Sequence, residues 1–71
     1  MTNQILIKLL RSFQEIEDGK SLNKLTYPYS SLGAYQRELW ESGYLNLGSS
    51  VAKCRLTQKG KEIVKQKEEK K

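Results

Sequence analysis

Three cationic side chains in the middle of the chain are the best candidates for binding chemistry. Arg37 lies in a stretch, 30–45, whose polar face otherwise carries short side chains, and Lys53 and Arg55 fall on one face of a predicted strand. Short side chains permit close approach to a DNA groove, in which an arginine reaches a phosphate or the edge of a guanine. Exposed cations beside a loop bind backbone phosphate. The spacing therefore predicts a nucleic-acid interface.

Catalytic and metal chemistry have few candidates in this sequence. There is no histidine, which excludes a His-based triad and a Cys/His zinc site, and the single cysteine, Cys54, excludes a disulfide within the chain. Cys54 is interpreted as a small buried hydrophobe, with a redox switch as the less favoured alternative. The carboxylates are expected on solvated helix faces. We therefore expect no enzymatic activity, no cofactor and no metal site.

Length and charge favour a small binding domain. The 71 residues are expected to form one domain at 1–67 and a charged, disordered tail at 68–71. Thirteen Lys and Arg against eight Asp and Glu give a formal charge of +5 and a pI near 9.5, which suits a polyanionic partner. No apolar run approaches the roughly 18 residues of a membrane span, and the N-terminus lacks the order of a secretion signal. A cytoplasmic location is therefore expected, without membrane association.

The stretch 30–45 is predicted to form a short amphipathic helix that leads directly into a strand. Its apolar positions recur at i, i+3 and i+7, which places them on one face: Leu32, Tyr35 and Leu39. Ser30 or Ser31 supplies an N-cap, and Gly43 adopts the left-handed conformation that ends a helix. Trp40, next to the inward Leu39, is expected to cover the edge of the core or a partner subunit.

A longer helix is predicted at 3–17, where apolar residues form a wide stripe. Asp18 and Gly19 end it. The stripe leaves Ile7 on a flank, where it either belongs to the core of one chain or takes part in dimerisation.

A short second helix is predicted at 21–26, capped by Ser21, with Leu22 and Leu25 directed inward. It ends because Pro28 disfavours helical geometry in the residue before it. The turn that follows carries two tyrosines, interpreted as core residues that close the turn or, as the less favoured alternative, as hydroxyl donors to phosphate: Tyr27 and Tyr29.

Beyond the central stretch, two strands are predicted at 45–47 and 51–56, joined by a hairpin loop at 48–50. Alternation in the second strand directs one set of side chains inward and the other outward. The inward set is Ala52, Cys54 and Leu56, and the outward set is Val51, Lys53 and Arg55. A last helix is predicted at 58–67, capped by Thr57 and anchored by Ile63 and Val64.

Two phrases carry a family resemblance. Residues 39–45, LWESGYL, resemble the end of the recognition helix in winged helix-turn-helix regulators, including the MarR-like, ArsR-like and PadR-like groups. Residues 56–64, LTQKGKEIV, are similar to the segment that follows the wing in the same superfamily. One hairpin length separates the two phrases, as a winged helix requires.

This resemblance implies a mainly α fold with a β-hairpin, namely three helices, a two-stranded wing and a C-terminal helix. It also implies that the third helix binds the DNA major groove and that the wing contacts flanking phosphate or the minor groove. The positions that match the family's DNA contacts are Ser30, Ser31, Gly33, Ala34 and Arg37 on the helix and Ser49, Ser50 and Lys53 on the wing. We add Arg55 to these predicted DNA contacts because it lies on the same face of the second strand as Lys53. The side chains of glycine and alanine offer no hydrogen bonds to base edges, so Gly33 and Ala34 are not expected to select a DNA sequence.

The favoured function is that of a small DNA-binding transcriptional regulator, acting as a homodimer through its first or last helix. One alternative is an accessory module of replication or recombination that binds single-stranded or structured DNA. Another is a winged helix that binds a protein.

Overall fold

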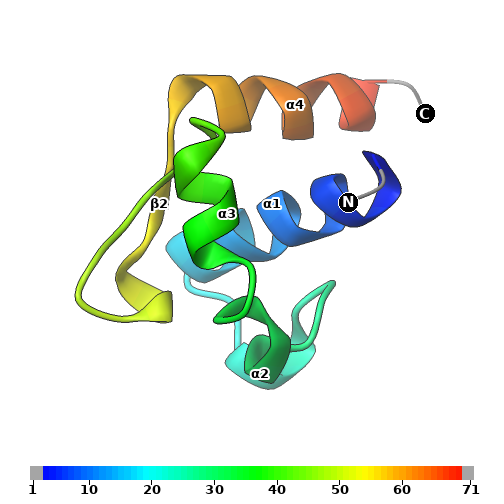
Figure 1. Cartoon of the computed structure of the whole chain (residues 1–71). Coiled ribbons are helices and arrows are strands. Elements are labelled where there is room, and N and C mark those ends of the chain that lie inside the picture. Colours follow the sequence, from blue (N-terminus) through cyan, green and yellow to red (C-terminus); the bar gives the residue numbers. More distant parts are fainter. Residues whose placement is uncertain (1–2, 70–71) are drawn as a thin grey trace.

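The computed structural model describes residues 3–69. Within this range the chain forms helices together with one two-stranded antiparallel sheet (Figure 1). The helices are α1 (Asn3–Glu17), α2 (Tyr29–Leu32), α3 (Gln36–Glu41) and α4 (Gln58–Glu69). The strands are β1 (Leu45–Asn46) and β2 (Arg55–Leu56), and two 3-10 turns are η1 (Leu22–Lys24) and η2 (Val51–Lys53). The mainly helical fold with a hairpin is confirmed.

Helix α1 has the predicted bounds and ends as predicted. Gly19 has φ +92°, and the N–H of Lys20 donates to the carbonyl of Glu15 at 2.9 Å. The N–H of Gly19 donates to the carbonyl of Ile16 at 3.0 Å, which completes a Schellman motif. Gly43, with φ +85°, ends α3 with the same pair of hydrogen bonds. Glycine is needed at both positions because a Cβ opposes left-handed backbone.

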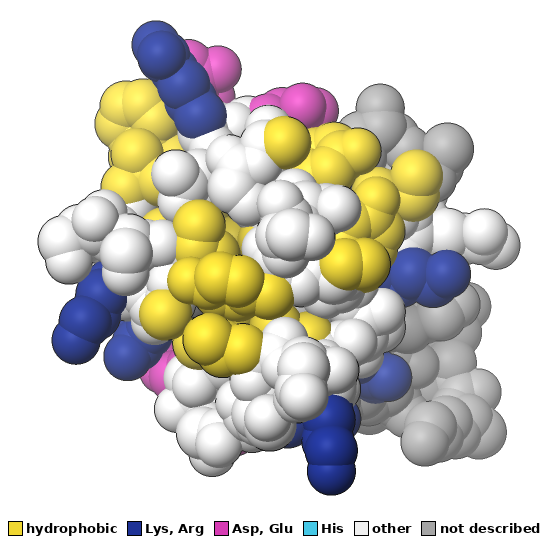
Figure 2. All heavy atoms as spheres, turned by 90° about the horizontal axis from the view of Figure 1, so that it is seen from below, with side chains coloured by type: hydrophobic (Ala, Val, Ile, Leu, Met, Phe, Trp, Pro, Cys, Tyr) yellow, Lys and Arg dark blue, Asp and Glu magenta, His cyan; other side chains and the backbone are white. Residues whose placement is uncertain are grey.

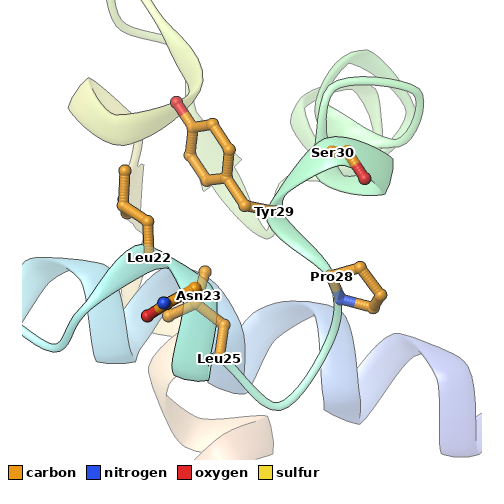
Figure 3. A pocket seen from close by; sticks show the side chains of 6 residues that line it. All are labelled: Leu22, Asn23, Leu25, Pro28, Tyr29 and Ser30. Carbon is orange, nitrogen blue, oxygen red and sulfur yellow. The ribbon is translucent and has the colours of Figure 1, made fainter.

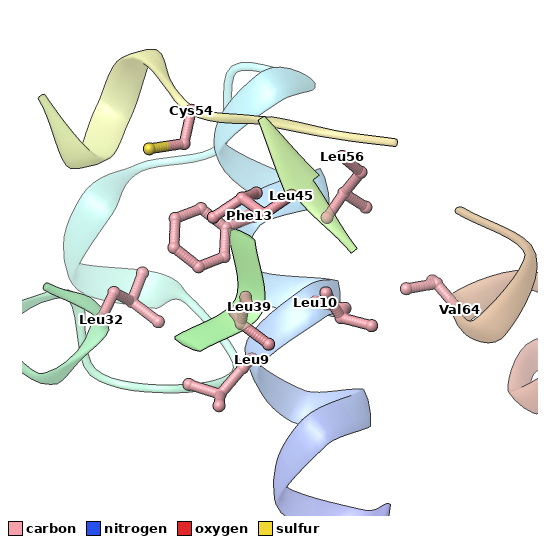
Figure 4. Packing of buried hydrophobic residues seen from close by; sticks show 9 residues of the cluster. All are labelled: Leu9, Leu10, Phe13, Leu32, Leu39, Leu45, Cys54, Leu56 and Val64. Carbon is pink, nitrogen blue, oxygen red and sulfur yellow. The ribbon is translucent and has the colours of Figure 1, made fainter. Parts of the chain in front are cut away.

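The hydrophobic core lies around α1, and α4 runs back along it so that the start of α1 and the end of α4 lie on the same side of the molecule (Figure 1). Figure 4 shows buried side chains converging from nearly every element, with Val64 of α4 entering from the edge. The buried cluster is Leu9, Leu10, Phe13, Leu32, Leu39, Leu45, Cys54, Leu56 and Val64. The inward placement of Cys54 and Leu56 is therefore confirmed.

The helix predicted within 30–45 is wrong in one respect, because it is divided into α2 and α3. Between them the N–H groups of Ala34 and Tyr35 donate to the carbonyls three residues back, at 3.3 and 3.0 Å. Tyr35 has φ −108°, outside the α-helical range. The predicted cap is also wrong: α2 starts at Tyr29, so Ser30 lies inside it, and no side chain caps either helix. Gly33 weakens the helix here because glycine loses the most backbone freedom on folding.

The helix predicted at 21–26 is also wrong, since only η1 forms there. Ser21 makes no capping bond, and Leu22 is 42% exposed rather than inward. Leu25 is already extended, with ψ 155°, and is half-buried against the core. The segment is too short to nucleate an α-helix before Pro28, so tertiary contacts decide its conformation.

The strand predicted at 51–56 forms only at β2. The two strands pair Leu45 with Leu56 and Asn46 with Arg55, and η2 occupies the start of the predicted strand. Val51 is therefore half-buried against the core instead of outward. The chain returns close to itself at this point, because a Cβ at Gly48 would lie 2.5 Å from the carbonyl oxygen of Lys53.

Helix α4 begins at the predicted cap. The N–H of Gly60 donates to Oγ1 of Thr57 at 3.2 Å, and Oγ1 in turn donates to the carbonyl of Gly43 at 2.6 Å. The helix extends to Glu69, two residues beyond the predicted end, and residues 70–71 of the predicted tail lie outside the described residues. Among the described residues, no helix combines the length and apolar character needed to cross a bilayer.

Candidate nucleic-acid interface

The tip of the β1–β2 hairpin packs against the junction of α2 and α3. A Cβ at Gly33 would lie 3.6 Å from Cγ2 of Val51, and the thiol of Cys54 donates to Oε1 of Gln36 at 3.5 Å. The carbonyl oxygen of Ser50, 3.4 Å from the same sulfur, is an alternative acceptor for the single thiol proton. Cys54 is fully buried, so its place is that of the small buried hydrophobe that the sequence predicts. These contacts connect the two groups of predicted site residues.

The predicted site residues lie at the surface, with one exception. Ser31 is half-buried, and the exposed members are Ser30, Gly33, Ala34, Arg37, Ser49, Ser50, Lys53 and Arg55. Figure 2 shows the side of the molecule that carries α2 and the hairpin tip. On it, hydrophobic side chains gather in patches, Lys and Arg project around the rim, and Asp and Glu appear only near the edges. This surface combines apolar area with positive charge.

Arg37 is the exposed cation of α3. Its side chain is 81% exposed, and its Nε lies 3.3 Å from Oε2 of Glu41, one turn further along α3. Exposed pairs with this spacing contribute only about 0.3–0.5 kcal/mol, so Arg37 exchanges this partner easily. Glu38 and Glu41 together outweigh the single positive charge of α3. A polyanion therefore meets favourable charge only near the N-terminal end of this helix.

Arg55 differs from Lys53 in having internal partners. Its Nη1 donates to the carbonyls of Ala52 and Cys54, at 3.1 and 2.9 Å. These bonds use one of the three guanidinium nitrogens and hold the group against the end of η2, where carbonyl groups point outward. Arg55 is therefore held in a defined orientation, whereas Lys53 is exposed at the hairpin tip.

Two polar residues that the sequence prediction left out hold the segment before α2 in place. Ser12 is fully buried in α1, and its Oγ accepts a hydrogen bond from the N–H of Tyr27 at 2.7 Å while donating to the carbonyl of Lys8 at 2.9 Å. Glu15 accepts bonds from the N–H and the hydroxyl of Thr26, both at 2.9 Å. A serine on the apolar stripe of a helix is the signal that could have revealed this connection.

The pKa of Glu15 is lowered. Partial burial opposes ionisation and is the largest single influence, but the hydrogen bonds from Thr26 and the neighbouring Lys20 ammonium, 3.3 Å away, together outweigh it. The carboxylate is thus stabilised in its charged form, and the loop before α2 depends on that charge.

The tyrosines near this segment serve mainly as packing residues. Tyr27, Tyr29 and Tyr35 are half-buried against the core, which agrees with the favoured interpretation of the first two. Tyr27 and Tyr35 meet edge to face with centroids 6.0 Å apart. A hydrogen bond with Tyr27 raises the pKa of Tyr35. These contacts hold the α2–α3 junction on the body of the domain.

Trp40 is 47% exposed and is not part of the buried cluster. It stands three residues after Arg37, on the same side of α3.

The described side chains contain no group of three His, Cys, Asp or Glu residues that could hold a metal ion. Comparison of the chain with protein-family models, with curated proteins and with solved structures found no match.

Proposed function

We propose that this protein is a winged helix-turn-helix regulator that binds double-stranded DNA. The observation that carries the proposal is the packing of the hairpin tip on the α2–α3 junction through Val51 and Cys54. This packing brings the small exposed residues of the junction close to the cations of the hairpin. From residue 42 to residue 61 the chain has four cations and no carboxylate: Lys53, Arg55, Lys59 and Lys61. The hairpin and the start of α4 therefore contribute only positive side-chain charge, which favours contact with a phosphate backbone.

The proposal assigns different tasks to the two parts of the surface. Gly33 and Ala34 have almost no side chain, so the junction can approach the floor of the major groove closely. Arg37 leaves Glu41 and reaches a phosphate or a guanine edge. Lys53 and Arg55 contact the backbone of the flanking duplex, where they contribute affinity without selecting sequence.

Two copies are proposed to bind together, because one α3 offers a single arginine for specific contacts. Ile7 supports this arrangement: it is only half-buried, and it is not among the residues packed on the core. An apolar side chain on the flank of α1 is suited to burial between two chains.

The test is a salt titration of binding to duplex DNA by wild type, Arg37→Ala and Lys53→Ala. Lys53→Ala is expected to weaken binding to all sequences alike and to reduce the slope of log K against log salt by about 1. Arg37→Ala is expected to weaken binding by about 1–3 kcal/mol and to relax base preference, measured by selection from a random duplex library.

The matched control is Lys65→Ala, which removes the same charge from an exposed position two turns into α4. It should leave the affinity and the salt slope close to those of wild type. Equal effects of Lys65→Ala and Lys53→Ala would mean that net charge alone drives binding. An absence of duplex binding would favour a protein partner instead, for which exposed Trp40 beside Arg37 is the natural contact.

A further inference from the structure

An open groove separates η1 from the start of α2. It has a volume of about 420 Å³ and is lined by Leu22, Asn23, Leu25, Pro28, Tyr29 and Ser30. Figure 3 shows the first three residues on the η1 side and the other three on the α2 side, with Leu22 and Tyr29 extending in the same direction. The groove exists because η1 is a single 3-10 turn and leaves Leu22 unburied.

The charged residues nearest in sequence to the groove lining are cations. From residue 19 to residue 37 the chain carries three cations, Lys20, Lys24 and Arg37, and no carboxylate. Glu15, which lies across the loop, is engaged by Thr26 and Lys20. Lys24 is exposed at the end of η1, next to Asn23 and Leu25 of the lining. The groove therefore suits a ligand that joins an apolar surface to negative charge.

The polar groups of the lining suit a flat heterocycle. Oδ1 of Asn23 accepts a hydrogen bond from the hydroxyl of Ser21 at 2.6 Å, which fixes the amide and leaves its NH₂ group as a donor. Tyr29 is half-buried against the core, so its ring is a rigid platform. Aromatic rings of this kind stack on nucleobases, and amides bond to base edges.

We propose that this groove binds one unpaired nucleotide, with its base against Tyr29 and Leu22 and its phosphate near Lys24. The inference rests on the proposed function and refines its substrate: duplex DNA that carries a single-stranded extension. Ser30 connects the two surfaces, since it lines the groove and also belongs to the predicted duplex contacts. The volume lies within the range of small-ligand sites, which accommodates a nucleotide and is too small for a base pair with its backbones.

The experiment compares the affinities of the full chain for a blunt duplex and for the same duplex with a short thymidine overhang, by fluorescence anisotropy at fixed salt. The overhang is expected to increase affinity about tenfold, as one stacked base does. Leu22→Glu places a carboxylate in the groove and should bring the ratio of the two affinities close to 1. Asn23→Ala should reduce the ratio by a smaller factor.

Leu47→Glu is the matched control, because Leu47 is 45% exposed against 42% for Leu22 and lies outside the groove lining. It makes the same change of charge and should preserve the ratio, even if both affinities fall. Circular dichroism of each variant checks its fold. Duplex binding with equal affinity for blunt and extended DNA would overturn the groove proposal and leave the proposed function standing. Binding to neither DNA would overturn both.

Discussion

At the scale of single residues, Ser12 and Glu15 show how polar side chains of a helix hold a neighbouring segment in place. Both lie on α1, and both bond to the short segment before α2. The N–H groups of Thr26 and Tyr27 have no helical partner there, because η1 ends before them. The N–H of Tyr27 is partly buried and needs a partner, which Ser12 supplies, while Glu15 binds the exposed N–H of Thr26. These bonds also set the position of the groove.

The charge of Glu15 should make stability depend on pH. Its pKa is lower in the folded chain than in the unfolded chain, so its contribution is fully present above the unfolded value and is lost as the pH falls through the folded value. We expect the free energy of unfolding by urea to fall between about pH 5 and pH 3, and to fall less in Glu15→Gln. Glu38→Gln, at an exposed position, is the charge-matched control. An identical pH profile for Glu15→Gln and wild type would contradict this assignment.

At the scale of elements, α4 approaches the chain closely at Tyr44, the residue before β1, and this contact helps to position the hairpin. Gly60 faces the carbonyl oxygen of Tyr44, and a Cβ there would collide with it. The same oxygen accepts a hydrogen bond from the N–H of Thr57 at 3.0 Å. Lys59 covers the other side, with its Nζ 4.7 Å from the centroid of the Tyr44 ring. The glycine of the LTQKG phrase is therefore required by the close packing of α4 on the backbone of Tyr44, just before β1.

Alanine substitutions at two glycines should have opposite effects on stability. Gly60→Ala is expected to lower the free energy of unfolding by about 1–3 kcal/mol, because overpacking outweighs the better helix propensity of alanine. Gly33→Ala is the control: its Cβ would make an ordinary 3.6 Å contact with Val51, and its φ of −60° suits alanine. This change should be neutral or stabilise by up to about 1 kcal/mol. Thermal and urea unfolding measure both, and an equal response at the two positions would refute the packing argument.

At the scale of the whole molecule, α1 lies at the centre of the domain and the cations of the predicted site lie at the surface. The radius of gyration over Cα atoms is 10.9 Å, close to the value of about 11 Å for a compact domain of this length. α1 supplies Leu9, Leu10 and Phe13 to one core that every other helix contacts. Ile7, on the flank of α1, is half-buried and is not among the residues packed on this core.

The proposed pairing of two copies predicts a mass of twice 8.2 kDa in light scattering at the concentrations used for DNA binding. Ile7→Glu should give a folded monomer, because Ile7 is outside the core cluster, and should weaken duplex binding at least about tenfold through the loss of the second copy. Gln4→Glu, at an exposed position of the same helix, makes the same change of one negative charge and is the control. A wild-type chain that is monomeric with and without DNA would refute the pairing.

The sequence by itself determined the features that depend on local chemistry. The bounds of α1, the glycine ends of α1 and α3, the Thr57 cap and the inward Cys54 follow from apolar spacing, left-handed backbone and capping. Each of these needs only a few neighbouring residues, so a pattern in the chain is sufficient to predict it.

Tertiary structure decided the features in which local preferences are weak. The residues at 21–26 and 51–53 form 3-10 turns, and the helix predicted within 30–45 is divided at Gly33, because short segments adopt the conformation that distant contacts favour. Those contacts join residues far apart in sequence, such as Ser12 with Tyr27 and Cys54 with Gln36. The groove beside Tyr29 and the surface shared by α3 and the hairpin follow from them, since only the folded chain brings these side chains together.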